Sequence, residues 1–313
     1  MNVVLLFPGQ GSQKPGMARD LVTALPAARD TFSAVDDALG ESLSTVCFDG
    51  PAETLTLTHN AQPALLTHGA AVWAAVKDRV GAHVRAAAGH SLGEFTAYHA
   101  AGSLDVVDAA RLVRRRGELM LASGEQRPGA MAAILGDVEG GIEAVCERAT
   151  AEAGCVVAAN YNSPGQVVIS GEVAGVERAM DLAKAAGAKR AMRLNVSGAF
   201  HSPLMAVARD GLAAAIDCGE FRDPAFPVYA NVTAEPVRSA GEARRLLLEQ
   251  LTAPVRWTAL VERLAADFPD ALYVEMGPGA VLTGLVKKIA PNVQTMTCGT
   301  VGEVEELLTR VTE

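Results

Sequence analysis

The pentapeptide Gly-His-Ser-Leu-Gly at residues 89–93 constrains the fold of this chain more than any other segment. It matches the Gly-x-Ser-x-Gly pattern, in which a serine stands on a sharp turn between a strand and a helix. Residues 84–88 before it are typical of a strand, and residues 92–101 are typical of a helix that ends at Gly102. The small glycines let the backbone pass close by, and the helix N-terminus directs its positive dipole end at the serine. We therefore predict that Ser91 is a nucleophile rather than part of a structural turn.

Strand and helix patterns alternate along most of the 313 residues, which predicts an α/β architecture with a largely parallel sheet. The pattern breaks near residues 123–129. The segment that follows has the predicted order strand, helix, strand, strand, helix, strand, which is the order of a ferredoxin-like unit. We expect residues 1–125 and 197–313 to form a large α/β-hydrolase-like domain with a mostly parallel sheet. Residues 126–196 are expected to form an inserted ferredoxin-like α+β subdomain, whose two middle strands are joined by a loop at residues 160–165.

Composition argues against several classes of partner and site. Half of the residues are apolar and the formal net charge is −9, so we expect no nucleic-acid partner and no anionic-membrane partner. No uncharged apolar run is long enough to span a bilayer, and the first residues lack the basic region of a signal peptide. The five cysteines are scattered without a Cys-x-x-Cys pair. We therefore expect reduced thiols, no metal site and a cytoplasmic protein.

A nucleophilic serine requires a base, which is usually a histidine. Of the six histidines, His201 is the best placed, because it follows a predicted strand and stands directly before Ser202 and Pro203. A capping serine and a proline at the first helical position would hold this loop rigid, whereas a histidine on an ordinary surface loop is the alternative. No acid stands where a conventional hydrolase triad would have it. A Ser–His dyad, with a carbonyl that orients the imidazole of His201, is the simpler prediction.

An oxyanion hole requires two backbone N–H donors aimed at one oxygen. The elbow supplies the N–H of Leu92. The loop after the first predicted strand, residues 3–7, can supply the N–H of Gln10, which stands between Gly9 and Gly11. The same loop could instead cradle a phosphate, but it lacks the third glycine of a dinucleotide fingerprint and the Gly-Lys-Ser/Thr of a P-loop. We therefore rank nucleotide binding below an oxyanion role.

Arg116 is predicted to face inward from its helix. The apolar residues Leu112, Val113, Leu119 and Met120 lie three and four positions away, on the same helical face. A buried arginine needs an anion, because an unpaired buried charge is strongly unfavourable. Helical spacing leaves two interpretations open. Arg116 either forms a structural ion pair with a protein carboxylate or clamps a substrate carboxylate.

With these residues in place, the chain resembles the malonyl-CoA:acyl carrier protein transacylases, the stand-alone acyltransferases of fatty acid and polyketide synthesis. The resemblance covers nearly the whole chain, and many motifs occur in order. They are residues 7–13, 89–94, 116–117, 129–134 and 160–166, then Phe200-His201, Gln250 before Pro254-Val255, and residues 277–279.

The resemblance implies a ping-pong reaction through a malonyl-Ser91 ester. Ser91, with His201 as its base, would attack the thioester of malonyl-CoA. The phosphopantetheine thiol of a holo acyl carrier protein would then take the malonyl group. No metal or redox cofactor would be needed, and we expect a monomer.

The same resemblance assigns the remaining site residues. The oxyanion hole would consist of Gln10 and Leu92, and the substrate-binding residues would be Arg116, Gln250, Phe200, Met120, Asn160 and Asn162. Arg116 would bind the malonyl carboxylate, and the main-chain carbonyl of Gln250 would orient His201. The ring of Phe200 would crowd an α-methyl branch and so favour malonyl, whereas ordinary packing of the cleft is the alternative.

Two other classes of protein stay open. A serine hydrolase shares the elbow but does not need Arg116. A non-catalytic carrier-protein docking subunit would not need an intact Ser91 or His201. An acidic carrier would need a basic docking patch on this protein. The alternative is that the basic residues available for it are ordinary solvated surface residues. The candidates for such a patch are Lys184, Lys189, Arg190, Lys287 and Lys288.

Overall fold

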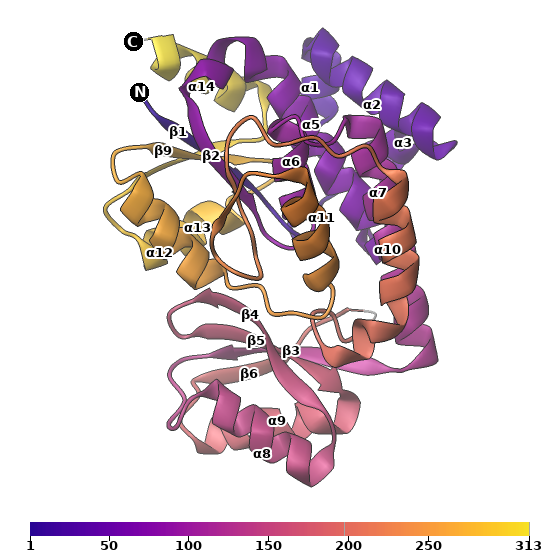
Figure 1. Ribbon diagram of the computed structural model, residues 1–313, viewed down its shortest axis with the longest axis vertical. Helices are drawn as coiled ribbons and strands as arrows, with labels where there is room; N and C mark the ends of the chain where they lie inside the picture. The colour runs from indigo at the N-terminus through magenta and orange to yellow at the C-terminus, as the bar shows by residue number, and fades with distance from the viewer. Residues whose placement is uncertain (197, 313) are drawn as a thin grey trace.

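Two separate sheets organise the structure, a computed structural model that describes residues 1–196 and 198–312 (Figure 1). The larger sheet lies in the upper part of Figure 1 and the smaller one in the lower part, with the two chain termini together at the top. Ser197, where we predict that the chain returns to the larger unit, lies outside the described residues.

The larger sheet has six strands in the order β10-β9-β1-β2-β7-β8. All neighbours in it run parallel except β7 and β8. The bounds are β1 Val3–Phe7, β2 Val84–Gly89, β7 Val228–Tyr229, β8 Pro236–Val237, β9 Leu272–Met276 and β10 Gln294–Cys298. The predicted α/β architecture with a mostly parallel sheet is therefore confirmed.

Strand β1 lies in the middle of this sheet and is buried on both faces. Because successive side chains of a strand point to opposite faces, Leu5 and Leu6 belong to different hydrophobic clusters. The Leu5 cluster includes helices α5 (Thr58–Val80), α6 (Gly93–Ala100) and α7 (Val106–Gln126). The Leu6 cluster includes helices α12 (Trp257–Asp267) and α13 (Val281–Ile289). This double burial explains why β1 is an uninterrupted apolar run rather than an alternating one.

The remaining helices of the larger unit pack mostly against other helices and connect its strands (Figure 1). They are α1 Arg19–Ala24, α2 Pro26–Leu39, α3 Leu43–Asp49, α4 Ala52–Thr56, the short 3-10 helices η1 Gly81–His83 and η2 Pro203–Ala208, and α10 Arg209–Cys218, α11 Ala240–Glu249 and α14 Val301–Thr312. Helices α3, α4 and α14 and strands β8 and β10 were not predicted from the sequence patterns. Helix α5 begins at Thr58 and contains Pro63.

The smaller sheet is antiparallel and has the order β4-β5-β3-β6. Its elements are β3 Gly129–Leu135, α8 Ile142–Ala153, β4 Val156–Ser163, β5 Gln166–Glu172, α9 Val173–Ala185 and β6 Arg190–Arg193. Ala132 and Ile134 contribute to a core shared with α8 and α9, whereas Met131 and Ala133 belong to the main cluster of the larger unit. One face of the sheet therefore carries its own helices, and the other face packs against the larger unit.

The prediction of a loop at residues 160–165 is wrong, because β4 continues to Ser163 and only Pro164 and Gly165 form the turn. The physical reason lies in a distant segment. The N–H of Tyr161 donates to the carbonyl of Val255 at 2.9 Å, and the N–H of Val255 donates to that of Ala159 at 2.8 Å. These bonds stabilise the outer edge of β4 through a partner that is remote in sequence.

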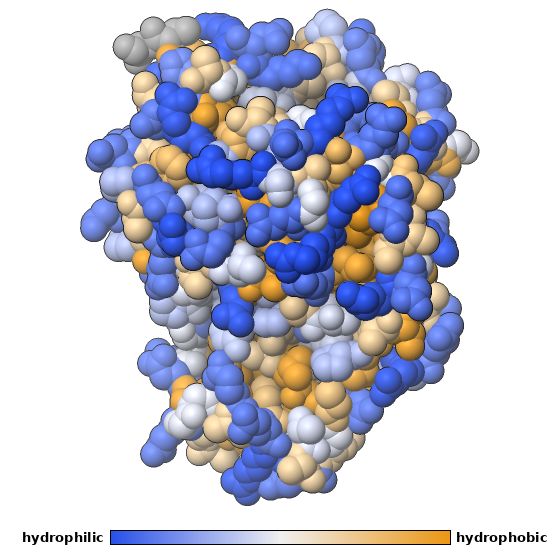
Figure 2. All heavy atoms as spheres, viewed as in Figure 1, coloured by the Kyte–Doolittle hydropathy of each residue, from blue (hydrophilic) through white to orange (hydrophobic). Residues whose placement is uncertain are grey.

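Hydrophilic residues cover much of the visible face, with apolar residues between them (Figure 2). Among residues 1–196 and 198–312, no group of three or more His, Cys, Asp or Glu side chains could hold a metal ion. In the same part of the chain, no helix is both long and apolar enough to cross a membrane. All five cysteines are free.

Candidate active site

The nucleophile elbow lies where β2 ends at Gly89 and α6 begins at Gly93. Ser91, between them, has a φ of 51°, a left-handed conformation that residues with a side chain rarely adopt. The glycines make this turn possible. A Cβ atom on Gly89 would lie 1.9 Å from the backbone of Gly93, and one on Gly93 would lie 2.1 Å from the carbonyl oxygen of Phe7. The predicted strand, sharp turn and helix are therefore all present.

His201 meets Ser91 although the two are 110 residues apart, since its Nε2 atom lies 2.8 Å from the Oγ atom of Ser91. Its Nδ1 atom lies 2.9 Å from the main-chain oxygen of Gln250. Because a carbonyl oxygen only accepts, Nδ1 carries the hydrogen and Nε2 is left to accept the serine proton. Burial, followed by the charge of Arg116, lowers the pKa of His201 to about 3, so the imidazole is neutral at physiological pH. The geometry fits a dyad in which a carbonyl takes the place of the acid in a triad.

Arg116 points from α7 into the same centre and is only 1% exposed. Its Nη1 atom donates to Oε1 of Gln62 at 2.7 Å, and its Nη2 atom donates to Oε1 of Gln250 at 2.9 Å. The same Nη2 atom donates to Oγ of Ser91 at 3.1 Å. Burial lowers the pKa of Arg116 to about 10, an effect that Glu94 partly offsets, so the guanidinium stays charged near neutral pH.

No ion pair joins Arg116 to a carboxylate among the described residues, and its Nε atom has no hydrogen-bond partner there. Its neutral partners, Gln62, Gln250 and Ser91, supply oxygens but no full negative charge. A buried cation in such a setting favours an anionic ligand, because the missing counter-charge raises its energy. Of the two interpretations that the helical spacing left open, the direct structural ion pair is therefore the weaker one.

Two residues behind the dyad, Glu94 and Asn231, were not predicted from the sequence, and both are fully buried. The Oε2 atom of Glu94 accepts from the N–H of Asn231 at 3.0 Å and from Nε2 of Gln250 at 2.7 Å. The Oδ1 atom of Asn231 in turn accepts from the N–H of Ser91 at 2.7 Å. Glu94 is the only acid in α6, one turn after the serine, and that position was the signal available in the sequence. Asn231 gave no such signal.

The two predicted oxyanion donors lie on neighbouring loops. Phe7 pairs with Gly89 across β1 and β2, which brings the loop after β1 beside the elbow. The side chain of Gln10 is fixed there, because its Oε1 atom accepts from the hydroxyl of Thr58 at 3.0 Å. The main-chain N–H groups of Gln10 and Leu92 donate to no acceptor found among the described residues. Both groups are therefore available to a ligand oxygen, although their role stays a prediction.

A cavity of about 210 Å³ encloses these groups. Its walls come from loops and helices of the larger unit and from strands of the smaller sheet. Nine of the ten predicted site residues line it, and Gln250 lies buried behind His201. The lining residues are Gln10, Gln62, His90, Ser91, Leu92, Arg116, Met120, Met131, Asn160, Asn162, Val168, Leu194, Val196, Phe200 and His201.

Asn160 and Asn162 line this cavity from β4 rather than from the predicted loop. The Oδ1 atom of Asn162 lies 2.8 Å from Nε2 of His90, the residue before the nucleophile. This bond holds the smaller sheet against the elbow, so Asn162 has a structural partner in addition to its predicted substrate role. Contact of either asparagine with substrate stays a prediction.

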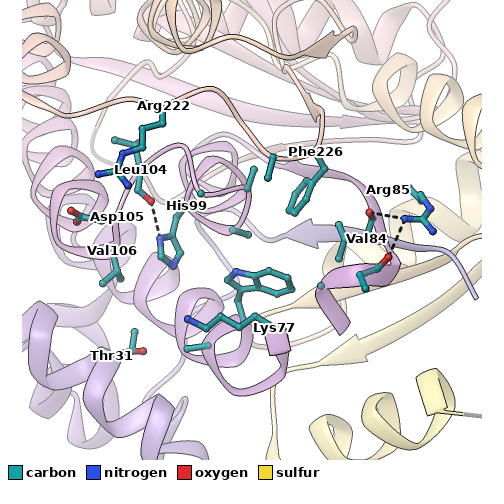
Figure 3. A pocket seen from close by; sticks show the side chains of 18 residues that line it. Thr31, Lys77, Val84, Arg85, His99, Leu104, Asp105, Val106, Arg222 and Phe226 are labelled. Atoms are coloured by element: carbon teal, nitrogen blue, oxygen red, sulfur yellow. Dashed lines mark hydrogen bonds between the residues drawn. The ribbon is translucent and has the colours of Figure 1, made fainter. Parts of the chain in front are cut away.

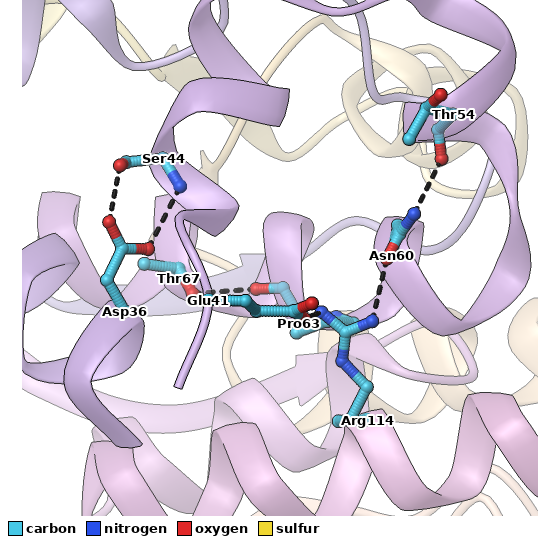
Figure 4. Close-up of polar contacts among 8 residues, drawn as sticks. All are labelled: Asp36, Glu41, Ser44, Thr54, Asn60, Pro63, Thr67 and Arg114. Carbon is cyan, nitrogen blue, oxygen red and sulfur yellow. Dashed lines mark hydrogen bonds and ion pairs between the residues drawn. The ribbon is translucent and has the colours of Figure 1, made fainter. Parts of the chain in front are cut away.

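At least four hollows elsewhere have a larger volume, and two of them illustrate the contrast with the cavity at Ser91. One, of about 770 Å³, is lined in part by Lys77, His99 and Arg222, and in it His99 contacts a backbone oxygen rather than a nucleophile (Figure 3). The other, of about 670 Å³, lies beside Arg114, whose guanidinium already pairs with Glu41 (Figure 4). Neither contains a paired nucleophile and base. Of these three cavities, the one at Ser91 is the one that combines a nucleophile with a base.

An α/β fold that brings a serine and a histidine together in one cavity, beside a loop with free N–H groups, is typical of the class of acyl-transferring serine enzymes. The model of the family described as the acyl transferase domain matches residues 4–307. The chain is 45% identical over 294 residues to a malonyl CoA-acyl carrier protein transacylase of Bacillus subtilis, covering 94% of this chain and 92% of that protein. It is 44% identical over 298 residues to the protein of the same name from Escherichia coli, covering 95% of each chain.

Comparison with solved structures shows the same similarity. The acyl-carrier-protein-S-malonyltransferase of Bartonella henselae superimposes with a TM-score of 0.95 at 41% identity, over 100% of both chains. A malonyl-transacylase solved with the holo acyl carrier protein of a type II polyketide synthase superimposes with a TM-score of 0.93 at 41% identity, over 99% of this chain and 100% of the other. The chain therefore belongs to the acyl transferase family, among the malonyl CoA-acyl carrier protein transacylases.

Proposed function

We propose that this protein transfers a malonyl group from malonyl-CoA to the phosphopantetheine thiol of a holo acyl carrier protein. The observation that carries the proposal is Arg116, a buried cation without a carboxylate partner among the described residues, 3.1 Å from the Oγ atom of Ser91. A cation so close to the nucleophile selects an acyl group that itself ends in a carboxylate. The names of the Bacillus subtilis and Escherichia coli relatives support the same substrate and acceptor.

The first half of the reaction forms an ester on Ser91. The Oγ atom attacks the thioester carbon of malonyl-CoA while Nε2 of His201 takes the hydroxyl proton. Negative charge develops on the thioester oxygen, where the N–H groups of Gln10 and Leu92 stabilise it. The C–S bond then breaks, CoA leaves as a thiol with the proton from His201, and malonyl-Ser91 remains. The carrier thiol reverses these steps on the same ester and restores free Ser91.

The malonyl carboxylate has an effect beyond binding. Arg116 is the second cause of the low pKa of His201, after burial. A carboxylate beside Arg116 offsets its charge and so raises the basicity of the imidazole. Substrates with a carboxylate therefore bring His201 closer to the pKa of an effective base, and uncharged acyl groups do not.

Phe200 forms part of the same cavity, next to His201. A Cβ atom on Gly198 would lie 3.3 Å from Cε1 of Phe200. The absence of a side chain at Gly198 therefore gives the Phe200 ring room to take its observed position. We infer that the ring limits branching at the α-carbon of the acyl group. One methyl group discriminates by about 1–3 kcal/mol, which gives a preference for malonyl over methylmalonyl.

We further infer that residues 1–125 and 197–313 form an α/β-hydrolase-like unit and residues 126–196 an inserted ferredoxin-like unit. The strand order β4-β5-β3-β6 with two helices on one face supports the second inference.

The mechanism uses groups of one chain alone, which supports a monomer without a metal or redox cofactor. A cytoplasmic location rests on the cysteine pattern and stays a prediction.

The test is incubation with malonyl-CoA, with and without a holo acyl carrier protein. We expect an adduct of one malonyl group on Ser91, found by intact-mass analysis and peptide mapping, and its transfer to the carrier. Ser91→Ala is the control and forms no adduct. Rapid release of CoA that depends on water, with no malonyl carrier formed, would show a serine hydrolase instead. Absence of any adduct on Ser91 would favour a non-catalytic docking subunit.

A further inference from the structure

We propose that Glu94 is a positioning residue whose buried carboxylate holds the nucleophile, the base and the substrate cation in one geometry. The proposal rests on the proposed function only in that Ser91 must react with the help of His201. The proposed reaction does not use Glu94 itself, since this residue does not line the cavity. Its influence passes through two other residues, Gln250 and Asn231.

One oxygen of Glu94 makes both connections. Its Oε2 atom accepts from Nε2 of Gln250 at 2.7 Å and from the N–H of Asn231 at 3.0 Å. Each donor comes from a different loop of the larger unit, since Asn231 follows β7 and Gln250 follows α11. A single oxygen atom thus holds the segment of Asn231 and the segment of Gln250 together. Both bonds are fully buried, so water cannot replace them at low cost.

Through Gln250, Glu94 influences the positions of His201 and Arg116. The main-chain oxygen of Gln250 lies 2.9 Å from Nδ1 of His201, and its Oε1 atom accepts from Nη2 of Arg116 at 2.9 Å. The Nε2 atom of Gln250 also donates to the main-chain oxygen of Ser91 at 3.0 Å. Releasing the amide of Gln250 would therefore loosen His201 and Arg116 together.

Through Asn231, Glu94 influences the backbone turn that carries Ser91. The Oδ1 atom of Asn231 accepts from the N–H of Ser91 at 2.7 Å, and its Nδ2 atom donates to the carbonyl of Gly89 at 2.7 Å. Ser91 has a strained φ of 51°, which persists only because the surroundings hold it. Glu94 supports these surroundings, because it receives the backbone N–H of the same asparagine.

The charge of Glu94 is of less importance than its oxygen. Burial raises the pKa of Glu94 to about 7, against the lowering effects of Asn231, Gln250 and Arg116, so a protonated form is accessible near neutral pH. Its second oxygen, Oε1, has no partner among the described residues. An amide oxygen can accept the two bonds as well as a carboxylate oxygen can. Glutamine at this position should therefore preserve the geometry.

Glu275 offers a matched control. It is also fully buried, and its carboxylate also receives two N–H groups, those of Leu282 at 3.0 Å and Thr283 at 2.7 Å. These donors belong to the first turn of α13, and neither they nor Glu275 line the cavity at Ser91. Glu275 therefore matches Glu94 in burial and in its number of donors, without contacts to Gln250 or Asn231. A purely structural role would make the two residues behave alike.

The experiment measures the rate at which a fluorophosphonate probe labels Ser91, for folded protein at a temperature well below each variant's melting point. The probe carries no malonyl group, so it reports the reactivity of the dyad independently of the substrate. We expect Glu94→Ala and Glu94→Asp to slow labelling about 10- to 100-fold, because buried donors lose their acceptor. We expect Glu94→Gln to stay within about threefold of the wild-type rate, and Glu275→Ala to lower the melting temperature without slowing the labelling of folded protein.

Three outcomes overturn the proposal: wild-type labelling in Glu94→Ala, equal slowing in Glu275→Ala and Glu94→Ala, or no rescue by Glu94→Gln. A wild-type protein that the probe does not label would overturn it as well. A wild-type protein that reacts with the probe but forms no malonyl adduct would reject the proposed function alone. The role of Glu94 would then still be decided by the labelling rates of its variants.

Discussion

The Nη2 atom of Arg116 donates a 3.1 Å hydrogen bond to the Oγ atom of Ser91, so the buried cation and the nucleophile are in direct contact in the free protein. The same hydroxyl lies 2.8 Å from Nε2 of His201 and has its proton on that side. A substrate carboxylate that takes the guanidinium therefore also frees an electron pair of the serine oxygen. With Arg116 as the proposed site of the substrate carboxylate, substrate selection and activation of the nucleophile would be linked through the Oγ atom of Ser91.

Arg116→Ala should lose malonyl transfer and keep or gain activity on an uncharged acyl-CoA. Loss of a charge-assisted hydrogen bond predicts a fall of about 10- to 100-fold in kcat/KM for malonyl-CoA. Competition between malonyl-CoA and acetyl-CoA for Ser91 measures the change. Arg114→Ala is the matched control, since that arginine pairs with Glu41 and Asn60 outside the cavity (Figure 4). Equal loss on both substrates would mean that Arg116 is structural.

His201 should remain an unprotonated base well below its ordinary titration range. Its pKa is lowered to about 3 by burial and then by Arg116, so the folded protein binds this proton only in strong acid. We expect kcat/KM, which reports the free enzyme, to stay level between about pH 8 and pH 5. Removal of a neighbouring positive charge raises a histidine pKa, so Arg116→Ala should move the acid limb to higher pH. A wild-type midpoint between pH 6 and 7 would contradict this expectation.

The same shift has a consequence for stability. Below pH 6.5 an unfolded chain takes up a proton on His201 while the folded chain does not. The unfolded state then binds more protons, so this residue makes the folded protein less stable as pH falls from about 6.5 towards 3. His201→Gln removes this dependence. Urea unfolding of both proteins across that range would show the difference.

Local sequence predicted the elbow, and long-range pairing determined what surrounds it. Residues 84–101 carry a strand, a glycine-flanked turn and a helix within one segment, so sequence alone sufficed for Ser91. His201 could be chosen by its rigid flanks and by elimination. Asn231 and Glu94 could not be assigned, because their partners are more than 130 residues away and no local pattern records such contacts.

The same limit explains the error in the smaller sheet. The polar run from Asn160 has the composition of a loop, and local propensity favours that prediction. Hydrogen bonds with Val255 make it the end of a strand instead. Both asparagines nevertheless line the cavity, because a β-strand presents alternate residues to one face.

Phe200→Ala should relax the preference for malonyl over methylmalonyl. The ring lines the cavity beside His201, and its removal opens space for a methyl branch. We expect the ratio of kcat/KM for methylmalonyl-CoA to that for malonyl-CoA to rise about tenfold, within the 1–3 kcal/mol that one methyl group decides. Gly198→Ala is the complementary variant, because its new Cβ atom would press on the ring at 3.3 Å. Parallel losses on both substrates would show that Phe200 only packs the cleft.

Ser91→Gly should be more stable than Ser91→Ala, although both variants are inactive. Each loses the hydroxyl and its contacts with His201 and Arg116, so the comparison isolates the backbone. At a φ of 51° alanine keeps the clash of Cβ with the backbone, which costs about 1–2 kcal/mol, whereas glycine has none. The greater freedom of glycine in the unfolded chain offsets about 0.4–1 kcal/mol of that gain. Urea unfolding should therefore favour Ser91→Gly by up to about 1.6 kcal/mol, and a more stable alanine variant would show that the turn at Ser91 is not strained.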